Sequence, residues 1–339
     1  MKSVPSKRTS ASSIANLLLA STLVLALGAA LAGCSPSSNS TAASKSASAS
    51  SSISATSVES PAANAEIADI TTIAYLGPEG TYTEEATRIF FGDNDDLMPQ
   101  KTVADALSLV ADGTAAYAVV PQENTLGGPV TDYIDAFLAA DGVSVVGEVI
   151  LPIRQTLMGL PGTDLSQVTR VLSHKQGLAQ SSAWLEKNLP NAERVETAST
   201  AAAAQEVASG NDSTAVAIAA PRAANLYGLD VLQENVSQSK ANKTRFYVVS
   251  RQPNELAGYD CAVFAANIAA DKLPNALEQA CSDGTELVCI HDRPEGSALG
   301  VYRYVIELER ESGFTSEDVA RIEGAGQLEC LGRYARVNG

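Results

Sequence analysis

The chain has 339 residues, of which 45% are apolar and 5% are aromatic, and it carries a formal net charge of −16 at pH 7. This length predicts about two domains, and Leu, Val, Ile and Ala must fill most of the core because aromatic residues are sparse. The acidic balance argues against a nucleic-acid-binding protein, which needs clustered Lys and Arg. It favours solubility and leaves a small anionic substrate open, because local donors bind such a ligand whatever the net charge.

The N-terminus has the organisation of a targeting segment. Basic residues precede an uncharged apolar stretch that ends at Leu31-Ala32-Gly33-Cys34. This tetrapeptide resembles the bacterial lipobox, which implies removal of residues 1–33 as a signal peptide and lipidation of Cys34. The alternatives are an ordinary signal peptide and a single membrane anchor, although the apolar stretch is short for a spanning helix. With a lipid on Cys34, the protein is expected to be exported and anchored to the outer face of the cell membrane without crossing it.

The next segment, residues 34–69, consists mostly of Ser, Ala and Thr and has no periodic apolar face. Such a composition buries too little surface to offset the entropy of the chain, so a disordered tether is expected. Folded structure is predicted to begin near Ile70.

From residue 72 to residue 250, short apolar runs alternate with amphipathic patterns. Strands alternating with helices predict an α/β fold with parallel sheets covered by helices on both faces. Ligands of such folds bind at the carboxyl ends of the strands, so the loops that follow strands are the places to search. The expected strands are 72–76, 117–121, 143–150, 168–172, 194–197, 215–219 and 246–249, and the expected helices begin at 81, 103, 130, 176, 198 and 221.

After Pro253 the pattern changes to a second domain at 258–339. The order of its elements is βαββαβ, which is typical of a ferredoxin-like unit. The expected strands are 261–268, 287–290, 301–309 and 328–337, and the expected helices are 273–281 and 316–322.

The four cysteines of this C-terminal segment have two interpretations. In an exported protein they can form disulfides, with three possible pairings. They can equally be small, partly buried apolar residues. No CxxC occurs and the histidines are His174 and His291, so no metal site is predicted. The cysteines concerned are Cys261, Cys281, Cys289 and Cys330.

Four loops carry polar residues beside glycine or at a strand end, and each one alone has an ordinary structural explanation. A glycine-bearing turn that leads into a helix can hold an anion, but a capped turn explains it equally well. A lone His at a strand-to-helix junction is more often structural than catalytic. The loops are 77–83 (GPEGTYT), 121–128 (PQENTLGG), 173–180 (SHKQGLAQ) and 242–246 (NKTRF).

Together and in this order, the four loops resemble the motifs of the prephenate dehydratase family, which look like GPxGTxS, P-x-ENS, SH-P-Q-x-x-x-Q and N-x-TRF. The resemblance covers nearly all of the segment from 72 to 250. Thr83 and Thr125 stand where the family usually has Ser, Lys175 stands in place of Pro, and Gln155 stands where His is common. The first two changes are mild, Lys175 adds positive charge, and Gln155 puts the positioning of the substrate in doubt.

The resemblance implies conversion of prephenate to phenylpyruvate with loss of water and carbon dioxide, without a metal or a cofactor. It implies a periplasmic-binding-protein-like catalytic domain at 70–252, with one lobe at about 72–150 plus 226–250 and the other at about 151–225. Thr244 is the expected catalytic residue, with a preorganised hydrogen bond to the departing hydroxyl, and Glu123 is the expected acid or positioning group. The expected substrate-binding residues are Asn124, Ser173, Gln176, Gln180, Thr81 and Arg245, whose alternative role is to fix the strand end.

The C-terminal unit resembles the ACT domain that follows this catalytic domain in many members of the family. The family's GAL and ESRP motifs are thought to bind phenylalanine, and the matching places here are Asn275-Ala276-Leu277 and His291-Asp292-Arg293-Pro294. The resemblance therefore implies phenylalanine as a possible effector, although the lost glycine hinders close approach of the backbone to a ligand. A homodimer or homotetramer is also expected.

Two other functions remain open from the sequence. A two-lobed α/β fold on a lipid-anchored tether also describes a solute-binding lipoprotein for an aromatic or small carboxylic acid. An arogenate dehydratase keeps the same chemistry with a different substrate. The retained Glu123-Asn124 and Thr244-Arg245-Phe246 favour the enzyme over the binding protein.

Overall fold

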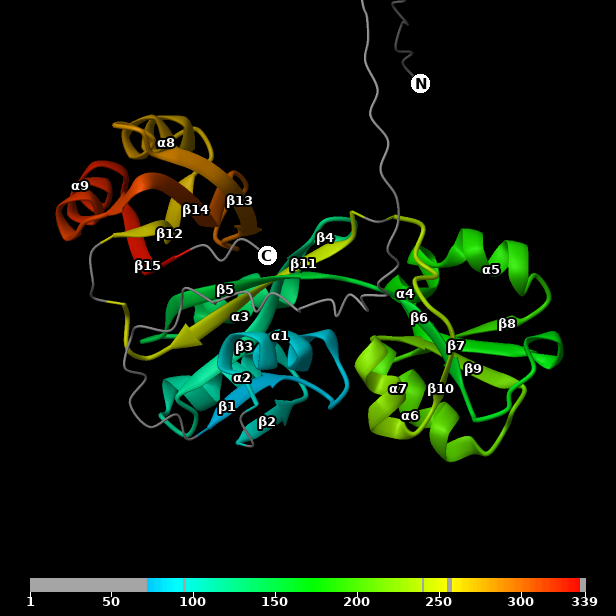
Figure 1. Cartoon of the computed structure of the whole chain (residues 1–339). Helices are drawn as coiled ribbons and strands as arrows, with labels where there is room; N and C mark the ends of the chain where they lie inside the picture. The colour runs from blue at the N-terminus through cyan, green and yellow to red at the C-terminus, as the bar shows by residue number, and fades with distance from the viewer. Residues whose placement is uncertain (1–71, 94–95, 240, 255–257, 336–339) are drawn as a thin grey trace, which may run out of the picture. The chain divides into compact units, whose positions relative to one another are not determined.

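The computed structural model describes residues 72–335 except 94–95, 240 and 255–257 (Figure 1). The predicted signal peptide, the tether and Cys34 lie outside the described residues. Among the described helices, none has the length and apolar character needed to span a membrane.

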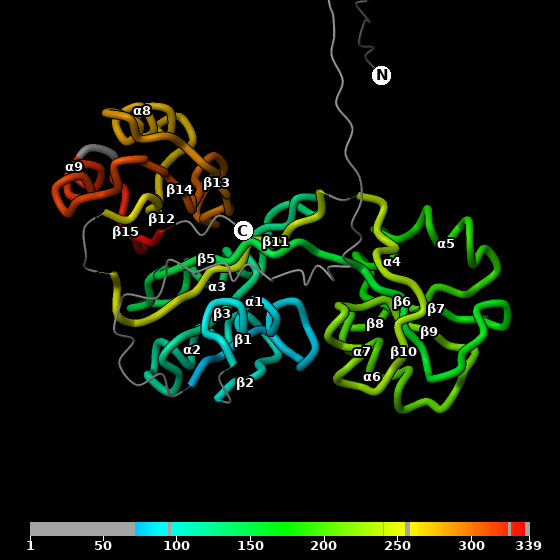
Figure 2. The backbone as a smooth tube through the Cα atoms, viewed as in Figure 1, coloured from blue at the N-terminus to red at the C-terminus, as the bar shows by residue number. Residues whose placement is uncertain are grey.

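The first lobe is built on a mixed sheet, which differs from the expected parallel one. Its strands β1, β2 and β3 run parallel, whereas β11 is antiparallel to both β3 and β5, between which it lies. The reason is that β11 brings the chain back from the second lobe in the opposite direction, as the trace in Figure 2 shows. The bounds are β1 Ile73–Leu76, β2 Leu97–Gln100, β3 Tyr117–Asn124, the short β4 Gly128–Pro129, β5 Ser144–Pro152 and β11 Lys243–Ser250.

Helices cover both faces of this sheet. Helix α1 (Tyr82–Phe91) packs on the face that carries Phe246 and Val248. Helices α2 (Val103–Ala111) and α3 (Thr131–Ala139) pack on the opposite face, which carries Tyr247. The apolar residues of α2 recur at helical spacing, so one side of that helix is buried, as the sequence predicts.

The second lobe is a five-stranded sheet in the order β10-β6-β9-β7-β8. Helices α6 and α7 pack on one face and α4 and α5 on the other. The expected return to the first lobe at residue 226 is too early, because β10 pairs with β6 and belongs to this sheet. The bounds are β6 Thr156–Gly159, η1 Leu165–Gln167, β7 Arg170–His174, α4 Lys175–Gln180, α5 Ser182–Asn188, β8 Glu193–Thr197, α6 Thr200–Gly210, β9 Ala215–Ala219, α7 Pro221–Tyr227 and β10 Asp230–Gln233.

The C-terminal unit has the predicted βαββαβ order, with the strand order β13-β14-β12-β15. Helices α8 and α9 cover one face of its strands, and the other face packs against Tyr247 and the cluster around α2 and α3. Strand β15 meets β5 at Gly332 and Val145, where a side chain on residue 332 would collide with the Val145 backbone. The bounds are β12 Tyr259–Ala269, α8 Leu273–Ala280, β13 Glu286–Pro294, β14 Val301–Phe314, α9 Ser316–Gly326 and β15 Leu328–Tyr334.

No disulfide joins the four described cysteines of this unit. Cys261 is buried, and Cys281, Cys289 and Cys330 are partly buried. The structure therefore favours the interpretation of small semi-buried residues over a disulfide framework.

Candidate active site

The register of β3 and β11 brings two of the predicted residues face to face. Thr244 pairs with Asn124 across the ladder, and both side chains are almost fully buried. Successive residues of a strand point to opposite faces. Thr244 and Phe246 therefore lie on the face covered by α1, and Arg245 and Tyr247 lie on the other.

The amide of Asn124 is held in one orientation by the backbone. Its Oδ1 accepts hydrogen bonds from the N–H groups of Leu126 and Gly127 at 3.0 and 2.9 Å. Its Nδ2 therefore faces the other way and donates to the Thr244 Oγ1 and the Asn242 Oδ1, both at 2.9 Å. Because the Thr244 oxygen accepts from Asn124, the hydroxyl hydrogen of Thr244 is available to a further acceptor.

A chain of amides continues from Asn242 to Tyr82 and joins the two lobes. The Gln180 Oε1 accepts from the Asn242 Nδ2 and from the Gln155 Nε2, each at 2.9 Å. The Gln155 Oε1 in turn accepts from the Tyr82 hydroxyl at 3.2 Å. Gln155, the departure from the family pattern, thus occupies a buried position in a continuous polar network.

Gln176 reaches Asn124 from the second lobe, with its Nε2 3.4 Å from the Asn124 Oδ1. Gly127 makes this approach possible, because a Cβ at this position would collide with the Gln176 amide. The predicted glycine-bearing loop and the predicted helix face therefore meet.

Thr81 caps α1 and supports the loop that precedes it. Its hydroxyl accepts from the Glu84 N–H and donates to the Leu76 carbonyl, each at 3.3 Å. The Glu84 carboxylate accepts from the Gly80 N–H and is ion-paired with Arg88 and Arg222. Burial alone would raise the pKa of Glu84, but these bonds outweigh it and lower that pKa. The hydroxyl of Thr81 is thus engaged by backbone groups.

Ser173 does not present its hydroxyl to a ligand. It is fully buried, and its Oγ donates to the Ile218 carbonyl at 2.7 Å. Gly177 packs directly against that oxygen. The side chain joins β7 to β9, and the substrate-binding role predicted for it is not supported by this geometry.

The side chains of Arg245 and Glu123 also point away from Thr244. Each is next to Thr244 or Asn124 along its strand, and adjacent strand residues point to opposite faces. The Arg245 guanidinium is ion-paired with Glu307 at 2.6 Å and with Glu148 at 3.4 Å. Burial acts to lower the pKa of Arg245, but the two carboxylates outweigh it and raise that pKa. The Glu123 carboxylate lies near Cys289 and His291 of β13. The structure therefore favours the alternative role of Arg245, and it places Glu123 outside the group around Thr244.

The residues predicted to bind an effector have separate surroundings. Asn275 is exposed, whereas Ala276 and Leu277 pack into the core beneath α8. Arg293 forms a two-pronged ion pair with Asp135 of α3, each bond being 2.7 Å long, and Pro294 ends β13.

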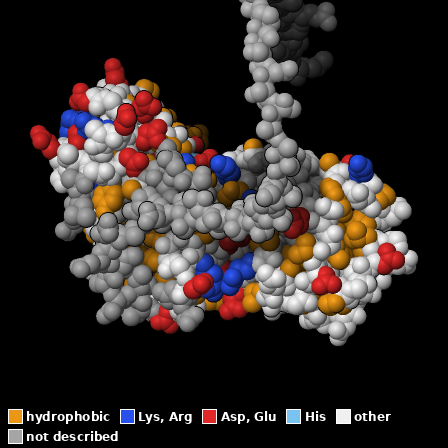
Figure 3. Space-filling model, viewed as in Figure 1, with side chains coloured by type: hydrophobic (Ala, Val, Ile, Leu, Met, Phe, Trp, Pro, Cys, Tyr) orange, Lys and Arg blue, Asp and Glu red, His pale blue; other side chains and the backbone are white. Residues whose placement is uncertain are grey.

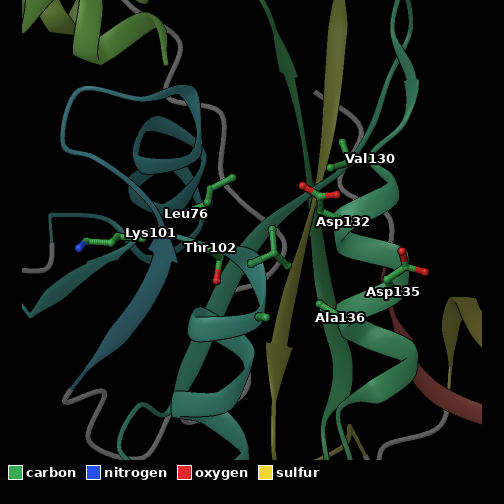
Figure 4. A pocket seen from close by; sticks show the side chains of 9 residues that line it. Leu76, Lys101, Thr102, Val130, Asp132, Asp135 and Ala136 are labelled. Carbon is green, nitrogen blue, oxygen red and sulfur yellow. The ribbon is translucent and has the colours of Figure 1, made fainter. Parts of the chain in front are cut away.

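Two pockets lie near these elements. The first is lined by Tyr82, Glu85, Leu151, Pro152, Arg154 and Pro221, and so borders the amide network at Tyr82. The second, of about 570 Å³, lies where β1 and β2 end and where α2 and α3 begin. In Figure 4, Asp132 and Asp135 line one side of this second pocket and Lys101 points away from them. That pocket therefore suits an anion poorly.

Sequence reasoning missed three members of the network. Asn242 belongs to the N-x-TRF motif but received no role, Gln155 was noted only as a departure, and Tyr82 lies unremarked within the first loop. Polar residues inside or beside the motifs were the available signal. Burial of Gln155, Gln180 and Asn242 to at most 8% exposure could not be foreseen.

The fold and the site define a two-lobed α/β catalytic domain followed by an ACT-like unit. A family model for prephenate dehydratase matches residues 73–254. A prephenate dehydratase of Corynebacterium glutamicum is 36% identical over 249 residues, covering 70% of this chain and 78% of the relative. The chain belongs to the prephenate dehydratase family.

Two solved structures are similar to this chain over most of its described length. A prephenate dehydratase from Arthrobacter aurescens in complex with L-Phe has a TM-score of 0.70 and 32% identity, covering 78% of this chain and 90% of that one. GqqA, described as a novel type of quorum quenching acylase, has a TM-score of 0.68 and 27% identity, covering 78% of this chain and 98% of that one. The predicted two-domain fold class is confirmed, with mixed sheets in place of parallel ones.

Proposed function

We propose that this chain is a prephenate dehydratase: it consumes prephenate and one proton and releases phenylpyruvate, carbon dioxide and water. The bond from the ring to its hydroxyl breaks, the ring carboxylate leaves as carbon dioxide, and the electron pair of that carbon–carbon bond completes the aromatic ring. The observation that carries the proposal is the hydrogen bond from Asn124 to the Thr244 oxygen.

That hydrogen bond determines what Thr244 can do. A hydroxyl has too high a pKa to be an effective free acid. Because its oxygen already accepts from Asn124, it can donate its hydrogen to the departing hydroxyl of the substrate. A donor fixed before the reaction is worth about 2.7–4 kcal/mol of transition-state stabilisation in a site that excludes water. The burial of Thr244 and Asn124 provides such surroundings.

The carboxylates of the substrate need positive charge despite the acidic net charge of the chain. Figure 3 shows a compact patch of Lys and Arg side chains on the face drawn, so the acidic charge is not uniform over the surface. Lys175 begins α4 beside Gln176 and is exposed. This lysine is the cation that we assign to the substrate.

Acyl hydrolysis, the activity in the description of GqqA, fits this site less well. It needs a nucleophile activated by an adjacent base. Thr244 has amide donors as neighbours, and Ser173 is buried against a backbone carbonyl. Both hydroxyls therefore lack the arrangement that would generate an alkoxide.

The direct test follows phenylpyruvate formation from prephenate by the purified full chain, with arogenate as the parallel substrate. Turnover of prephenate to phenylpyruvate is expected. Conversion of arogenate alone, to phenylalanine, would make the chain an arogenate dehydratase. Tight binding of either acid without turnover would make it a solute-binding protein and would refute the proposal.

Phenylalanine is the effector that we propose for the ACT-like unit, since the relative from Arthrobacter aurescens was solved with L-Phe. Millimolar phenylalanine should raise the thermal unfolding temperature and change kcat/KM for prephenate. Tyrosine serves as the control. Absence of both effects would separate this chain from that relative.

The lipobox supports export of the protein and its lipid anchorage through Cys34. A Cys34→Ser chain should move from the membrane fraction to the soluble or precursor fraction and lose incorporation of labelled fatty acid. Unchanged labelling of that variant would contradict the anchor. The oligomeric state, expected to be a dimer or tetramer, is measured by light scattering.

A further inference from the structure

We propose that Glu123, Cys289 and His291 form a zinc-binding site that ties the C-terminal unit to strand β3. Their ligand atoms lie within 4.8 Å of one another. Cys289 and His291 are two residues apart on β13 and therefore point to the same side of that strand. Glu123 faces them from β3, on the side opposite to Asn124. The sequence predicted no metal site because these three residues come together only through the tertiary packing of β13 near β3, two strands far apart in the sequence.

The donor set is the one that Zn²⁺ prefers. A thiolate, an imidazole and a carboxylate are its usual protein ligands, and three of them leave a fourth position for water. Mg²⁺ and Ca²⁺ prefer sets made of oxygen alone, so the thiol and the imidazole select against them. Binding of the ion displaces the proton of the Cys289 thiol, because the thiolate is the ligand form.

Gln122 supplies the support that a zinc-bound histidine requires. Its side chain is buried, and its Nε2 lies 2.8 Å from the His291 Nε2. The Gln122 Oε1 has no hydrogen-bond partner among the described residues. Turning the amide over places that oxygen against the imidazole N–H, which leaves the Nδ1 of His291 to bind the ion. Ligand histidines usually donate their second N–H to such a carbonyl.

The surrounding charge also favours a cation. Glu148 and Glu307 are fully buried, and the Cys289 thiol donates to the Glu307 carboxylate at 3.6 Å. Arg245 is ion-paired with both of these carboxylates. The carboxylates of Glu123, Glu148 and Glu307 therefore lie near Cys289 or near the single Arg245 guanidinium, and burying excess negative charge is costly. A divalent cation offsets the excess.

The test measures metal binding by the full chain after removal of metal with a chelator. Zn²⁺ is titrated against a chromophoric chelator, and Co²⁺ is titrated while the absorbance is recorded. One equivalent of Zn²⁺ per chain is expected, together with a near-ultraviolet Co²⁺–thiolate band. Zn²⁺ should also raise the temperature of unfolding, because it binds the folded state.

Ligand variants and a matched control identify the site. Cys289→Ser and His291→Ala should each weaken Zn²⁺ binding by at least about 100-fold, since loss of a supporting group alone costs about 10–100-fold. The isosteric Glu123→Gln serves where either of these fails to fold. Cys330→Ser removes another partly buried thiol of the same unit and should leave the affinity unchanged.

Two outcomes would overturn the site. The first is less than 0.2 equivalents, on the order of background, for the folded metal-free chain. The second is equal loss of binding in Cys330→Ser and Cys289→Ser.

Discussion

The two faces of strand β11 carry polar groups of different kinds. On one face, Thr244 belongs to a network of neutral hydroxyls and amides that runs through Asn124 to Gln180. On the other face, Arg245 and Tyr247 bind the Glu307 carboxylate in an ionic network beneath the C-terminal unit. One strand therefore contributes to a candidate reaction site and to a domain junction.

The two networks are expected to respond differently to the loss of one hydrogen bond or ion pair. A neutral hydrogen bond contributes only about 0.5–1.5 kcal/mol net. Replacing a hydrogen bond between two amides with one to a substrate therefore costs little. Breaking a buried ion pair leaves an uncompensated charge and costs about 3–5 kcal/mol. The neutral face is therefore suited to turnover, and the ionic face to holding the two domains together.

The largest expected effect comes from breaking the ionic face. Arg245→Met should lower the free energy of unfolding by about 3–5 kcal/mol, because Glu148 and Glu307 lose their cation. Urea denaturation at neutral pH measures it. A loss below about 1 kcal/mol would show that the junction does not depend on this guanidinium.

Removing the Thr244 donor from the neutral network should affect turnover instead. Thr244→Val keeps the shape of the side chain but removes the donor, so kcat should fall about 10²–10³-fold while stability changes by no more than about 1 kcal/mol. Thr244→Ser is the control and should retain most of the activity. Steady-state kinetics on prephenate with full activity in the valine variant would remove Thr244 from the mechanism.

The Glu84 carboxylate of α1 contributes to stability through its charge, so its contribution depends on pH. The pKa of Glu84 is lowered, so its contribution to stability is present above its ordinary value and is lost as the pH falls through the folded-state value. Glu84→Gln should cost about 1.5–3 kcal/mol at pH 7, and the difference should vanish in acid. Denaturation curves across pH measure this.

The pKa of Glu85, the next residue, shifts in the opposite direction to that of Glu84, so Glu85 serves as the control. Burial raises the pKa of Glu85, so its charged form is penalised in the folded state. Glu85→Gln should leave stability at pH 7 unchanged or slightly higher. Equal losses in the two variants would contradict the assignment to the ion pairs of Glu84.

A smaller effect than that of Glu84→Gln is expected at Ser173. Ser173→Ala removes its bond to the Ile218 carbonyl and should cost about 0.5–1.5 kcal/mol of stability. Because the hydroxyl donates to a backbone carbonyl and lies apart from Thr244 and Asn124, kcat/KM should stay within about twofold of the parent value. A tenfold rise in KM would support the substrate contact that the sequence predicted for Ser173.

The sequence predicted the alternation of elements and the βαββαβ unit. It also predicted four residues of the neutral network, which are Asn124, Thr244, Gln176 and Gln180. It assigned both members of Glu123-Asn124 and of Thr244-Arg245 to one site, although adjacent strand residues point to opposite faces. It also ended the second lobe too early, because β10 is a short and largely exposed strand whose membership is decided by its pairing with β6. The trio of Glu123, Cys289 and His291 depends on tertiary contacts that no local pattern records.

Asn124 orients the hydroxyl of Thr244 as a donor in the proposed mechanism, and the Asn124→Asp variant tests this orientation. One carboxylate oxygen of the variant can still accept from the Leu126 and Gly127 N–H groups, but the other accepts from the Thr244 hydroxyl and captures its hydrogen. We predict a folded protein whose kcat on prephenate falls about as far as that of Thr244→Val, by about 10²–10³-fold. A folded Asn124→Asp enzyme with the kcat of the parent would contradict it.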